Sequence, residues 1–314
     1  MEYYAAPMEG ITGYIWRNAH HHFYPGIHKY FTPFLSPKMK KGMNSKERND
    51  VLREHNQGIH LVPQVLTNKA EEMVHMTGRM QELGYDEMNL NLGCPSATVV
   101  SKEKGCGFLR DRDRLRHFFE DTMNGLEQRG LSDMKLSVKT RLGLDDPDEI
   151  LSLMEIYNDY PLSEVIIHAR IHKDFYKKPV KWDAFRQALS MSRHPICYNG
   201  DLFSMEDVRT FAQEFPQVER VMLGRGLIAN PEFLEQDGRR LKDYPRFFAF
   251  HEEVVRGYQQ IMSGDRNVLF KMKELWSYME INFPGQDKVF KKIKKSNHLM
   301  EYMSAVSSLS YEMI

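Results

Sequence analysis

The stretch Asn89-Leu90-Asn91-Leu92-Gly93-Cys94-Pro95 decides the architecture that we expect for this chain. Polar and apolar residues alternate along it, which predicts a β-strand, and the Gly-Cys-Pro sequence ends that strand in a tight turn. The strand therefore carries two asparagines and a thiol to its carboxyl end. A single cysteine at a turn is more often a small buried residue than a reactive one, so the interpretation depends on the other strands.

Short apolar runs alternate with longer helical patterns over the first 240 residues or so. The expected strands are Tyr3–Met8, Lys29–Phe34, His60–Leu66, Glu87–Leu92, Met134–Thr140, Glu164–His168, Pro195–Asn199 and Arg220–Leu223. The expected helices are Lys69–Leu83, Arg112–Arg129, Pro147–Tyr157, Trp182–Ser192, Ser204–Phe215 and a short one from Pro231. This alternation predicts a parallel sheet, and eight units favour a closed (β/α)8 TIM barrel. An open doubly wound sheet would need a Gly-x-Gly-x-x-Gly turn where this chain has Pro7-Met8-Glu9-Gly10.

The pattern changes after residue 240, where strand signals stop. Helical segments follow at Phe247–Met262, Asn267–Asn282, Gln286–Ser296 and Asn297–Ser308. We therefore expect a catalytic barrel domain over residues 1–240 and a C-terminal helical bundle domain over residues 241–314. Residues 266–295 carry eight Lys and Arg residues and three acidic residues. That excess fits either a contact with nucleic acid or a solvated helix face.

The composition excludes several classes of protein. The 314 residues have a formal net charge of zero, so a nucleic-acid contact would have to come from a local basic patch. The three cysteines have no metal-binding spacing, and their odd number argues against a disulfide framework. No stretch approaches the roughly 18 apolar residues of a membrane span. We expect a cytoplasmic monomer without a membrane contact. We also expect no metal, because the side chains of His20-His21-His22 would point in different directions on a helix.

Polar or ionisable residues stand at the ends of nearly all the predicted strands, and these ends surround the active site of a barrel. Asn199-Gly200-Asp201 and Gly224-Arg225-Gly226 end the last two strands, where barrels bind phosphate. Glycines there let backbone N–H groups approach an anion, and arginine adds a bidentate contact. Gln64, Lys139 and His168 end other strands and suit a planar heterocycle. The pattern favours a phosphorylated planar cofactor, with non-covalent flavin mononucleotide (FMN) as the first choice.

Cys94 and Asn91 are expected on the open face of that cofactor. A thiol in this position can protonate a carbanion as hydride reaches the adjacent carbon. Arg141 and Arg170 end neighbouring strands and are placed for the carbonyl oxygens or phosphates of a substrate. Cys106, in the loop that follows, is a second candidate acid, whereas Cys197 lies inside a strand and is expected in the core.

Together these residues resemble the tRNA-dihydrouridine synthases. The motifs that carry the resemblance occur in the family's order, as Ala6-Pro7-Met8, Gln64, Asn89–Pro95, Lys139-Thr140-Arg141, His168-Ala169-Arg170, Asn199-Gly200-Asp201 and Gly224-Arg225-Gly226. The Asn-x-Gly-Cys-Pro element and the closing Gly-Arg-Gly are the specific ones. The resemblance covers the whole predicted barrel, and the C-terminal helices match in size and position more than in motif.

The resemblance implies an oxidoreductase that reduces the C5–C6 double bond of uridines in folded tRNA, using FMN and NADPH. N5 of the flavin would give hydride to C6, and Cys94 would protonate C5. The implied cofactor contacts are Pro7, Met8, Gln64, Lys139, His168, Asn199, Gly200, Asp201, Gly224 and Arg225. The implied contacts with the target base are Asn91, Arg141 and Tyr176, and the basic helices, with Lys291, Lys292, Lys294 and Lys295, would hold the RNA backbone.

Three alternatives stay open at the level of the sequence. The first is an FMN-dependent barrel enzyme that acts on a free pyrimidine, as dihydroorotate dehydrogenases do. The second is dihydrouridine synthesis in ribosomal RNA. The third is a non-catalytic RNA-binding factor, which predicts RNA binding without a yellow chromophore.

Overall fold

Parallel strands form a closed barrel in the computed structural model, which describes residues 1–37, 39 and 42–313. The strands are β1 (Glu2–Ala5), β2 (Lys29–Phe31), β3 (Leu61–Val62), β4 (Gln64–Val65), β5 (Glu87–Leu92), β6 (Lys135–Gly143), β7 (Val165–Ile171), β8 (Ile196–Asn199) and β9 (Arg220–Leu223). Their order in the sheet is β3-β2-β1-β9-β8-β7-β6-β5-β4. The expected (β/α)8 barrel is therefore confirmed.

The barrel closes at Pro63. This residue separates β3, which pairs with β2, from β4, which pairs with β5. Proline has no N–H group and therefore interrupts the hydrogen bonding of one strand position. Its carbonyl still accepts a hydrogen bond from the N–H of Asn89 at 2.9 Å. The strand expected at His60–Leu66 is thus two short segments, and the described strand segments occupy the eight positions of the barrel.

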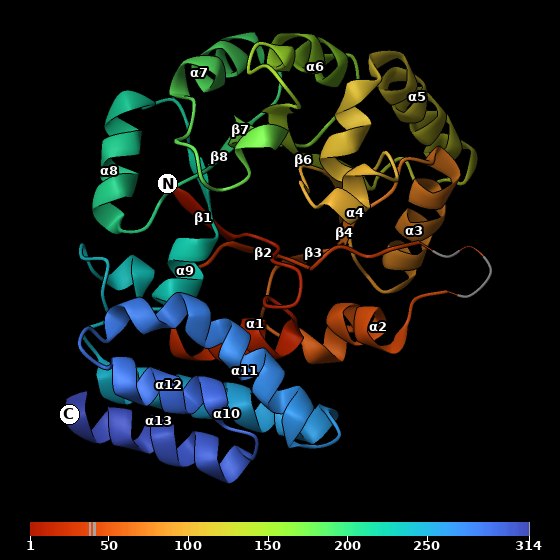
Figure 1. Ribbon diagram of the computed structural model, residues 1–314. Coiled ribbons are helices and arrows are strands. Elements are labelled where there is room, and N and C mark those ends of the chain that lie inside the picture. Colours follow the sequence, from red (N-terminus) through yellow and green to blue (C-terminus); the bar gives the residue numbers. More distant parts are fainter. Residues whose placement is uncertain (38, 40–41, 314) are drawn as a thin grey trace.

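Helices surround the strands, as Figure 1 shows. The expected outer helices are present as α3 (Ala70–Glu82), α5 (Arg112–Gln128), α6 (Glu149–Asn158), α7 (Trp182–Met191) and α8 (Met205–Glu214). Four further helices are α1 (Tyr14–Phe23), α2 (Ser45–Val51), α4 (Ala97–Val100) and α9 (Arg225–Ala229). The helix expected from Pro231 was misplaced, because α9 ends before that residue and only a single 3-10 turn, Phe233–Glu235, follows it.

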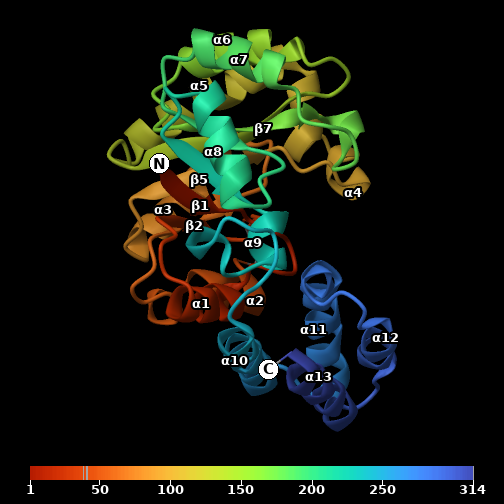
Figure 2. The same cartoon turned by 90° about the vertical axis from the view of Figure 1, so that its left-hand side faces the viewer.

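Four helices form the C-terminal region: α10 (Tyr244–Ile261), α11 (Asp265–Met279), α12 (Asp287–Lys295) and α13 (Leu299–Met313). Figure 2 shows α11, α12 and α13 beside the barrel, with α10 next to α1. Hydrogen bonds join the two parts, since Asn282 donates to the carbonyl of Ala229 at 2.6 Å and Lys271 donates to that of Gly10 at 2.6 Å. The helical region is therefore packed firmly against the barrel, and the domain division at residue 240 stays a prediction.

The interior of the barrel holds a cluster of apolar side chains and, at the amino ends of the strands, a cluster of ion pairs. Tyr4, Phe31, Ile166, Cys197 and Met222 belong to the apolar cluster, which places Cys197 in the core as expected. At the amino ends of the strands, Lys29 pairs with Glu87 at 2.9 Å and with Glu164 at 2.7 Å. These paired charges close the end of the barrel opposite to the one that the polar strand ends surround.

Candidate active site

The carboxyl ends of the strands surround a cavity of about 340 Å³, here called the central cavity. This volume lies within the range of small-molecule and cofactor sites. The sequence-predicted residues that line it are Pro7, Met8, Gln64, Asn91, Cys94, Lys139, His168, Tyr176, Asn199, Gly200, Asp201, Gly224 and Arg225. Parallel strands of a barrel all end on one face, which is why residues so far apart in the chain meet here.

The side chain of Asn91 holds the turn that carries Cys94. Its Oδ1 atom accepts hydrogen bonds from the backbone N–H groups of Gly93 at 3.1 Å and Cys94 at 3.0 Å. Its Nδ2 atom donates to Oε1 of Gln64 at 2.8 Å, and Nε2 of Gln64 donates to Oδ1 of Asn89 at 2.8 Å. The alternating asparagines of β5 thus form one buried network inside the barrel, and this network fixes the position of the thiol.

The thiol of Cys94 is half-buried and faces the central cavity. Burial raises its pKa above the usual 9.0, against the opposing effects of the Ser96 N–H group and of Arg141 and Lys139. The group is therefore a protonated thiol at neutral pH, which is the form that a general acid requires. Cys106 is fully buried, and its thiol faces the carbonyl of Gly143 at 3.6 Å. Among the described residues that line the cavity, Cys94 is the only cysteine.

Lys139 supplies a cation whose charge is unusually easy to remove. Burial, and then repulsion from Arg141, lower its pKa from 10.5 to about 8. Its Nζ atom donates to Oδ1 of Asn199 at 3.1 Å, and Nδ2 of Asn199 donates to the carbonyl of Met222 at 2.7 Å. The lysine of β6 is thereby linked to β8 and β9 across the mouth of the barrel. An anion bound beside it would raise its pKa again.

His168 is buried and neutral. Burial, and then Arg141, Lys139 and further arginines, lower its pKa well below 6.5. Nη1 of Arg170 lies 3.1 Å from Nε2 of His168, and because a guanidinium only donates, Nε2 is the acceptor. A neutral imidazole that accepts at Nε2 carries its proton on Nδ1. The arginine therefore fixes the tautomer of His168.

Two arginines and an aspartate support this histidine. Arg170 pairs with Asp201, which also pairs with Arg225 at 2.8 Å. Asp201 adopts the left-handed backbone conformation, with φ of +43°, directly after Gly200, which has φ of +147°. A Cβ atom on Gly200 would lie 2.7 Å from Cγ1 of Val180, so the turn after β8 requires glycine at this position.

Tyr176 stands at the mouth of the cavity with half of its surface exposed. Its ring stacks on His168, with the ring centroids 5.8 Å apart. The guanidinium of Arg141 lies 5.2 Å from the ring centroid, and that of Arg225 lies 5.1 Å from it. Cation–π contacts of this kind hold an aromatic ring in place.

Among the residues predicted to contact the cofactor or the target base from the strand ends, Arg141 and Arg170 do not line the cavity. Both are buried. Arg141 donates to the carbonyls of Gly93 at 3.0 Å, Ile171 at 2.9 Å and Phe175 at 2.9 Å, and Arg170 donates to that of Lys178 at 2.6 Å. In this structure they order the turn after β5 and the loop after β7.

Comparison with known proteins identifies the family. Residues 4–312 match the family model described as dihydrouridine synthase. The chain belongs to the dihydrouridine synthase family. Proteins named tRNA-dihydrouridine(16) synthase are among its relatives, at 28% identity over 155 residues in Pseudomonas syringae pv. tomato and 24% over 268 residues in Neisseria meningitidis serogroup B. These matches cover 49% and 82% of this chain and 47% and 78% of the relatives, so the chain spans only about half the length of the first.

Solved structures confirm the fold of this dihydrouridine synthase family member. Histamine dehydrogenase from Rhizobium sp. 4-9 has a TM-score of 0.56 at 11% identity, covering 87% of this chain and 49% of that one. Morphinone reductase has a TM-score of 0.52 at 10% identity, covering 74% and 84%. At such identities the likeness is one of architecture alone.

The C-terminal region of the dihydrouridine synthase chain contributes two residues to the cavity, Glu274 and Tyr278, that sequence reasoning missed. Both lie on α11, four residues apart and therefore on one face. Lys271, on the same face, donates to the carbonyl of Gly10 at 2.6 Å and pairs with Glu274 at 3.5 Å. Their spacing was visible in the sequence, but nothing in it showed that this face of α11 meets the barrel.

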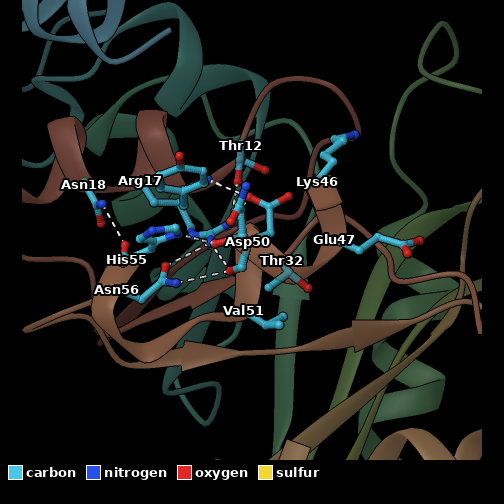
Figure 3. A network of polar contacts seen from close by, with 12 residues as sticks. Thr12, Arg17, Asn18, Thr32, Lys46, Glu47, Asp50, Val51, His55 and Asn56 are labelled. Atoms are coloured by element: carbon cyan, nitrogen blue, oxygen red, sulfur yellow. Dashed lines mark hydrogen bonds and ion pairs between the residues drawn. The ribbon is translucent and has the colours of Figure 1, made fainter. Parts of the chain in front are cut away.

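A buried polar network anchors the loop after β1, as Figure 3 shows. Arg17 is fully buried and donates to the carbonyls of Thr12 at 2.8 Å and Asp50 at 2.7 Å, and to Oδ1 of Asn56 at 2.9 Å. The hydroxyl of Thr12 accepts from the N–H of Met8 at 2.8 Å. Because Met8 lines the cavity, this network sets the position of one of its walls.

The remaining predictions concern surfaces away from the cavity. Lys291, Lys292, Lys294 and Lys295 are all exposed on α12. Over the described residues, no three His, Cys, Asp or Glu side chains gather in a way that could hold a metal ion. Within the same residues, no helix combines the length and apolar character needed to cross a bilayer.

Proposed function

We propose that this protein reduces uridine to 5,6-dihydrouridine in tRNA, with non-covalently bound FMN as cofactor and NADPH as reductant. The observation that carries the proposal is the placement of the half-buried Cys94 thiol in one cavity with Lys139, His168 and Arg225. The family membership and the relatives named as tRNA-dihydrouridine synthases support it. Hydride addition creates negative charge, which basic groups can stabilise, and the protonation that follows needs an acid, which a neutral thiol can supply.

The residues of the cavity fit a flavin nucleotide. Gly200, Gly224 and Arg225 stand at the ends of β8 and β9, where a phosphate would meet backbone N–H groups and a guanidinium. Lys139, Gln64, His168 and the backbone at Pro7 and Met8 would surround the ring, and Asn199 and Asp201 the ribityl-phosphate end. When bound and reduced by NADPH, the flavin would supply from N5 the hydride that adds to C6 of the uracil.

Lys139 and His168 are suited to opposite parts of such a ring. The Nζ atom of Lys139 is a cation that can offset negative charge on a ring oxygen or nitrogen. His168 offers a neutral Nδ1–H donor, because Arg170 occupies Nε2. Asp201 holds both Arg170 and Arg225, so it orients the histidine and the phosphate-binding guanidinium together.

Cys94 would give its proton to C5 of the uracil. Its raised pKa keeps the thiol protonated until this step, and Asn91 keeps the turn that carries it in one position. Asn91 uses Oδ1 on the backbone and one Nδ2–H on Gln64, which leaves its second Nδ2–H for the base. Cys106 faces the Gly143 carbonyl inside the core, which favours Cys94 as the acid.

Tyr176 would hold the target base at the cavity mouth. A base in a folded RNA has to leave its stack to reach a buried cofactor, and exposed aromatic rings bind such bases by stacking. Arg141 supports that ring, and its buried Nη2 atom has no hydrogen-bond partner in the described part of the chain. Because Arg141 is fully buried and does not line the cavity, we assign it to holding Tyr176 in place, and its contact with the base stays a prediction. Arg170, predicted to bind substrate, uses each of its three nitrogens in a contact within the protein and does not line the cavity, so it is better assigned to positioning His168.

The helical region of residues 241–314 would bind the tRNA backbone. Lys291, Lys292, Lys294 and Lys295 place four exposed cations on α12, and phosphate contacts by lysine supply sequence-independent affinity. A monomer that acts in the cytoplasm completes the proposal.

Two measurements on the purified protein test it. An absorbance scan should show a flavin spectrum, and its absence would favour a non-catalytic RNA-binding protein. The NADPH-reduced protein should then be reoxidised by tRNA lacking dihydrouridine, and not by free uridine nucleotides or orotate. Reoxidation by the free pyrimidines alone would replace the proposal with a free-pyrimidine oxidoreductase, and reoxidation by ribosomal RNA alone would change the substrate.

A further inference from the structure

A second hollow opens beside the central cavity, and we call it the α11–α12 groove. It has a volume of about 620 Å³ and lies between α9, the end of α11 and α12. Figure 1 shows α9 next to α11. Phe203, Arg225 and Tyr278 line both the groove and the central cavity, so the two hollows are adjacent. Anything that extends out of the cavity mouth past these three residues enters the groove.

The lining of the groove combines apolar surface with cations. Tyr278 and Phe203 present rings, and the guanidinium of Arg225 lies 5.4 Å from the centroid of Phe203. Ile281 adds apolar surface and is 58% exposed, which is high for such a side chain. Lys291 and Lys294 line the groove from α12. Aromatic rings beside lysine and arginine are the lining that binds single-stranded nucleic acid, by stacking the bases and pairing the phosphates.

We infer that the α11–α12 groove binds the nucleotide adjacent to the target uridine in the RNA strand. The inference rests on the proposed function and names a further site within it. A uridine whose base has entered the central cavity stays joined to its neighbours through phosphodiesters, so the strand has to leave by the mouth. Enzymes that extrude a base also contact the nucleotides flanking it. The groove lies next to the mouth and offers those nucleotides rings and cations.

A phosphate that binds in the groove could take the place of Glu280 as the partner of Lys294. Nζ of Lys294 pairs with Glu280 at 2.7 Å, and the two side chains are 53% and 36% exposed. Exposed ion pairs contribute little to stability, so Lys294 can exchange Glu280 for a phosphate at small cost. Glu280 and Asp287 are the acidic residues that line the groove. Glu280 therefore competes with the RNA, and its neutralisation should strengthen binding.

Helix α12 provides a matched comparison. The double variant Lys291→Ala/Lys294→Ala removes the two lysines that line the groove. Lys292→Ala/Lys295→Ala removes two lysines of the same helix that are also exposed but do not line it. The dissociation constant for tRNA should rise about tenfold in the groove pair and about threefold at most in the other pair, because only the first also loses contacts with the nucleotide held in the groove. Glu280→Gln should lower the dissociation constant two- to threefold, roughly the effect of one screened charge.

The outcomes separate the inference from the proposed function. Equal weakening by the two lysine pairs, or unchanged binding by Glu280→Gln, would overturn the groove assignment while leaving tRNA reduction by the unaltered protein intact. If the groove pair instead slows flavin reduction by NADPH and leaves tRNA binding unchanged, the groove holds the dinucleotide and the inference is wrong. If the unaltered protein neither binds nor reduces tRNA, the proposed function itself fails. Misfolding of a variant can weaken tRNA binding but cannot strengthen it. The tighter tRNA binding expected of Glu280→Gln therefore tests the groove even if the lysine variants are unstable.

Discussion

Replacing Cys94 with Ala should separate the two half-reactions of the proposed enzyme. The substitution removes the sulfur and leaves the backbone unchanged. Asn91 holds the turn through the backbone N–H groups of Gly93 and Cys94, and these hydrogen bonds do not depend on the side chain of residue 94. The cavity wall formed by this turn should therefore survive. We expect flavin binding and its reduction by NADPH to be unchanged, and the reduction of uridine in tRNA to slow about 10²- to 10⁴-fold, the usual contribution of a general acid.

The size of the effect follows from the state of the thiol. Burial raises the pKa of this thiol above its ordinary value, so the thiol carries the transferable proton at pH 7. In the unaltered protein, the rate constant for uridine reduction should then stay level through neutral pH and fall above about pH 9, as the thiol ionises. This basic limb should be missing from the residual activity of Cys94→Ala.

Rapid mixing of pre-reduced protein with tRNA measures the relevant step, followed by flavin reoxidation and by dihydrouridine content. Cys106→Ala is the matched control, because it removes a thiol that is buried away from the cavity and should leave both half-reactions unchanged. A Cys94→Ala protein that reduces uridine at the normal rate would refute the reasoning. So would a loss of activity in Cys106→Ala equal to that in Cys94→Ala.

Three further predictions concern the groups around the thiol. The pKa of Lys139 is about 8 in the protein without ligand, so binding of reduced FMN, whose ring is anionic, should take up a proton at about pH 9. Anaerobic calorimetry in buffers of different ionisation enthalpy measures this uptake. Lys139→Met should abolish it, and equal uptake in both proteins would contradict the assignment. Arg17→Met leaves the carboxylate of Asp50 buried without its cation. The free energy of unfolding, measured by urea titration, should therefore fall by about 3–5 kcal/mol. A loss below about 1 kcal/mol would show that the ion pair is not needed for stability. Arg170→Gln removes a neighbouring charge and the guanidinium that donates to Nε2 of His168. The pKa of His168, measured by NMR titration, should therefore rise toward 6.5, whereas Arg170→Lys should keep it low. Equal pKa values in the two variants would argue against this role of Arg170.

The barrel could be predicted because its signals are local. The bounds of β5 and β9 agree with the sequence prediction, since both strands are bounded runs of suitable residues. Helices α1, α2 and α9 were not predicted, because they are short or rich in polar residues. In α1, three histidines and Arg17 leave few apolar positions, and its N-cap residue Gly13 makes no side-chain cap.

The part of the site that lies at the strand ends could be predicted from the sequence, because the barrel topology alone brings those residues together. Residues near the carboxyl end of a predicted strand, such as Lys139 and Cys94, meet because all barrel strands end on one face. The position of Arg141 could not be predicted in this way: it follows Lys139 by two residues, yet its side chain turns to the carbonyls of Ile171 and Phe175. Tyr278 reaches the cavity only because α11 packs against the barrel, which no local pattern encodes.

The central claim is that this chain, with a flavin in the barrel mouth, reduces uridine in tRNA. The most direct measurement is a map of dihydrouridine in tRNA from cells that make the protein, cells that lack it, and cells in which it is restored. We predict that at least one tRNA position loses dihydrouridine when the protein is absent and regains it when the protein returns. An identical map in all three would contradict the account.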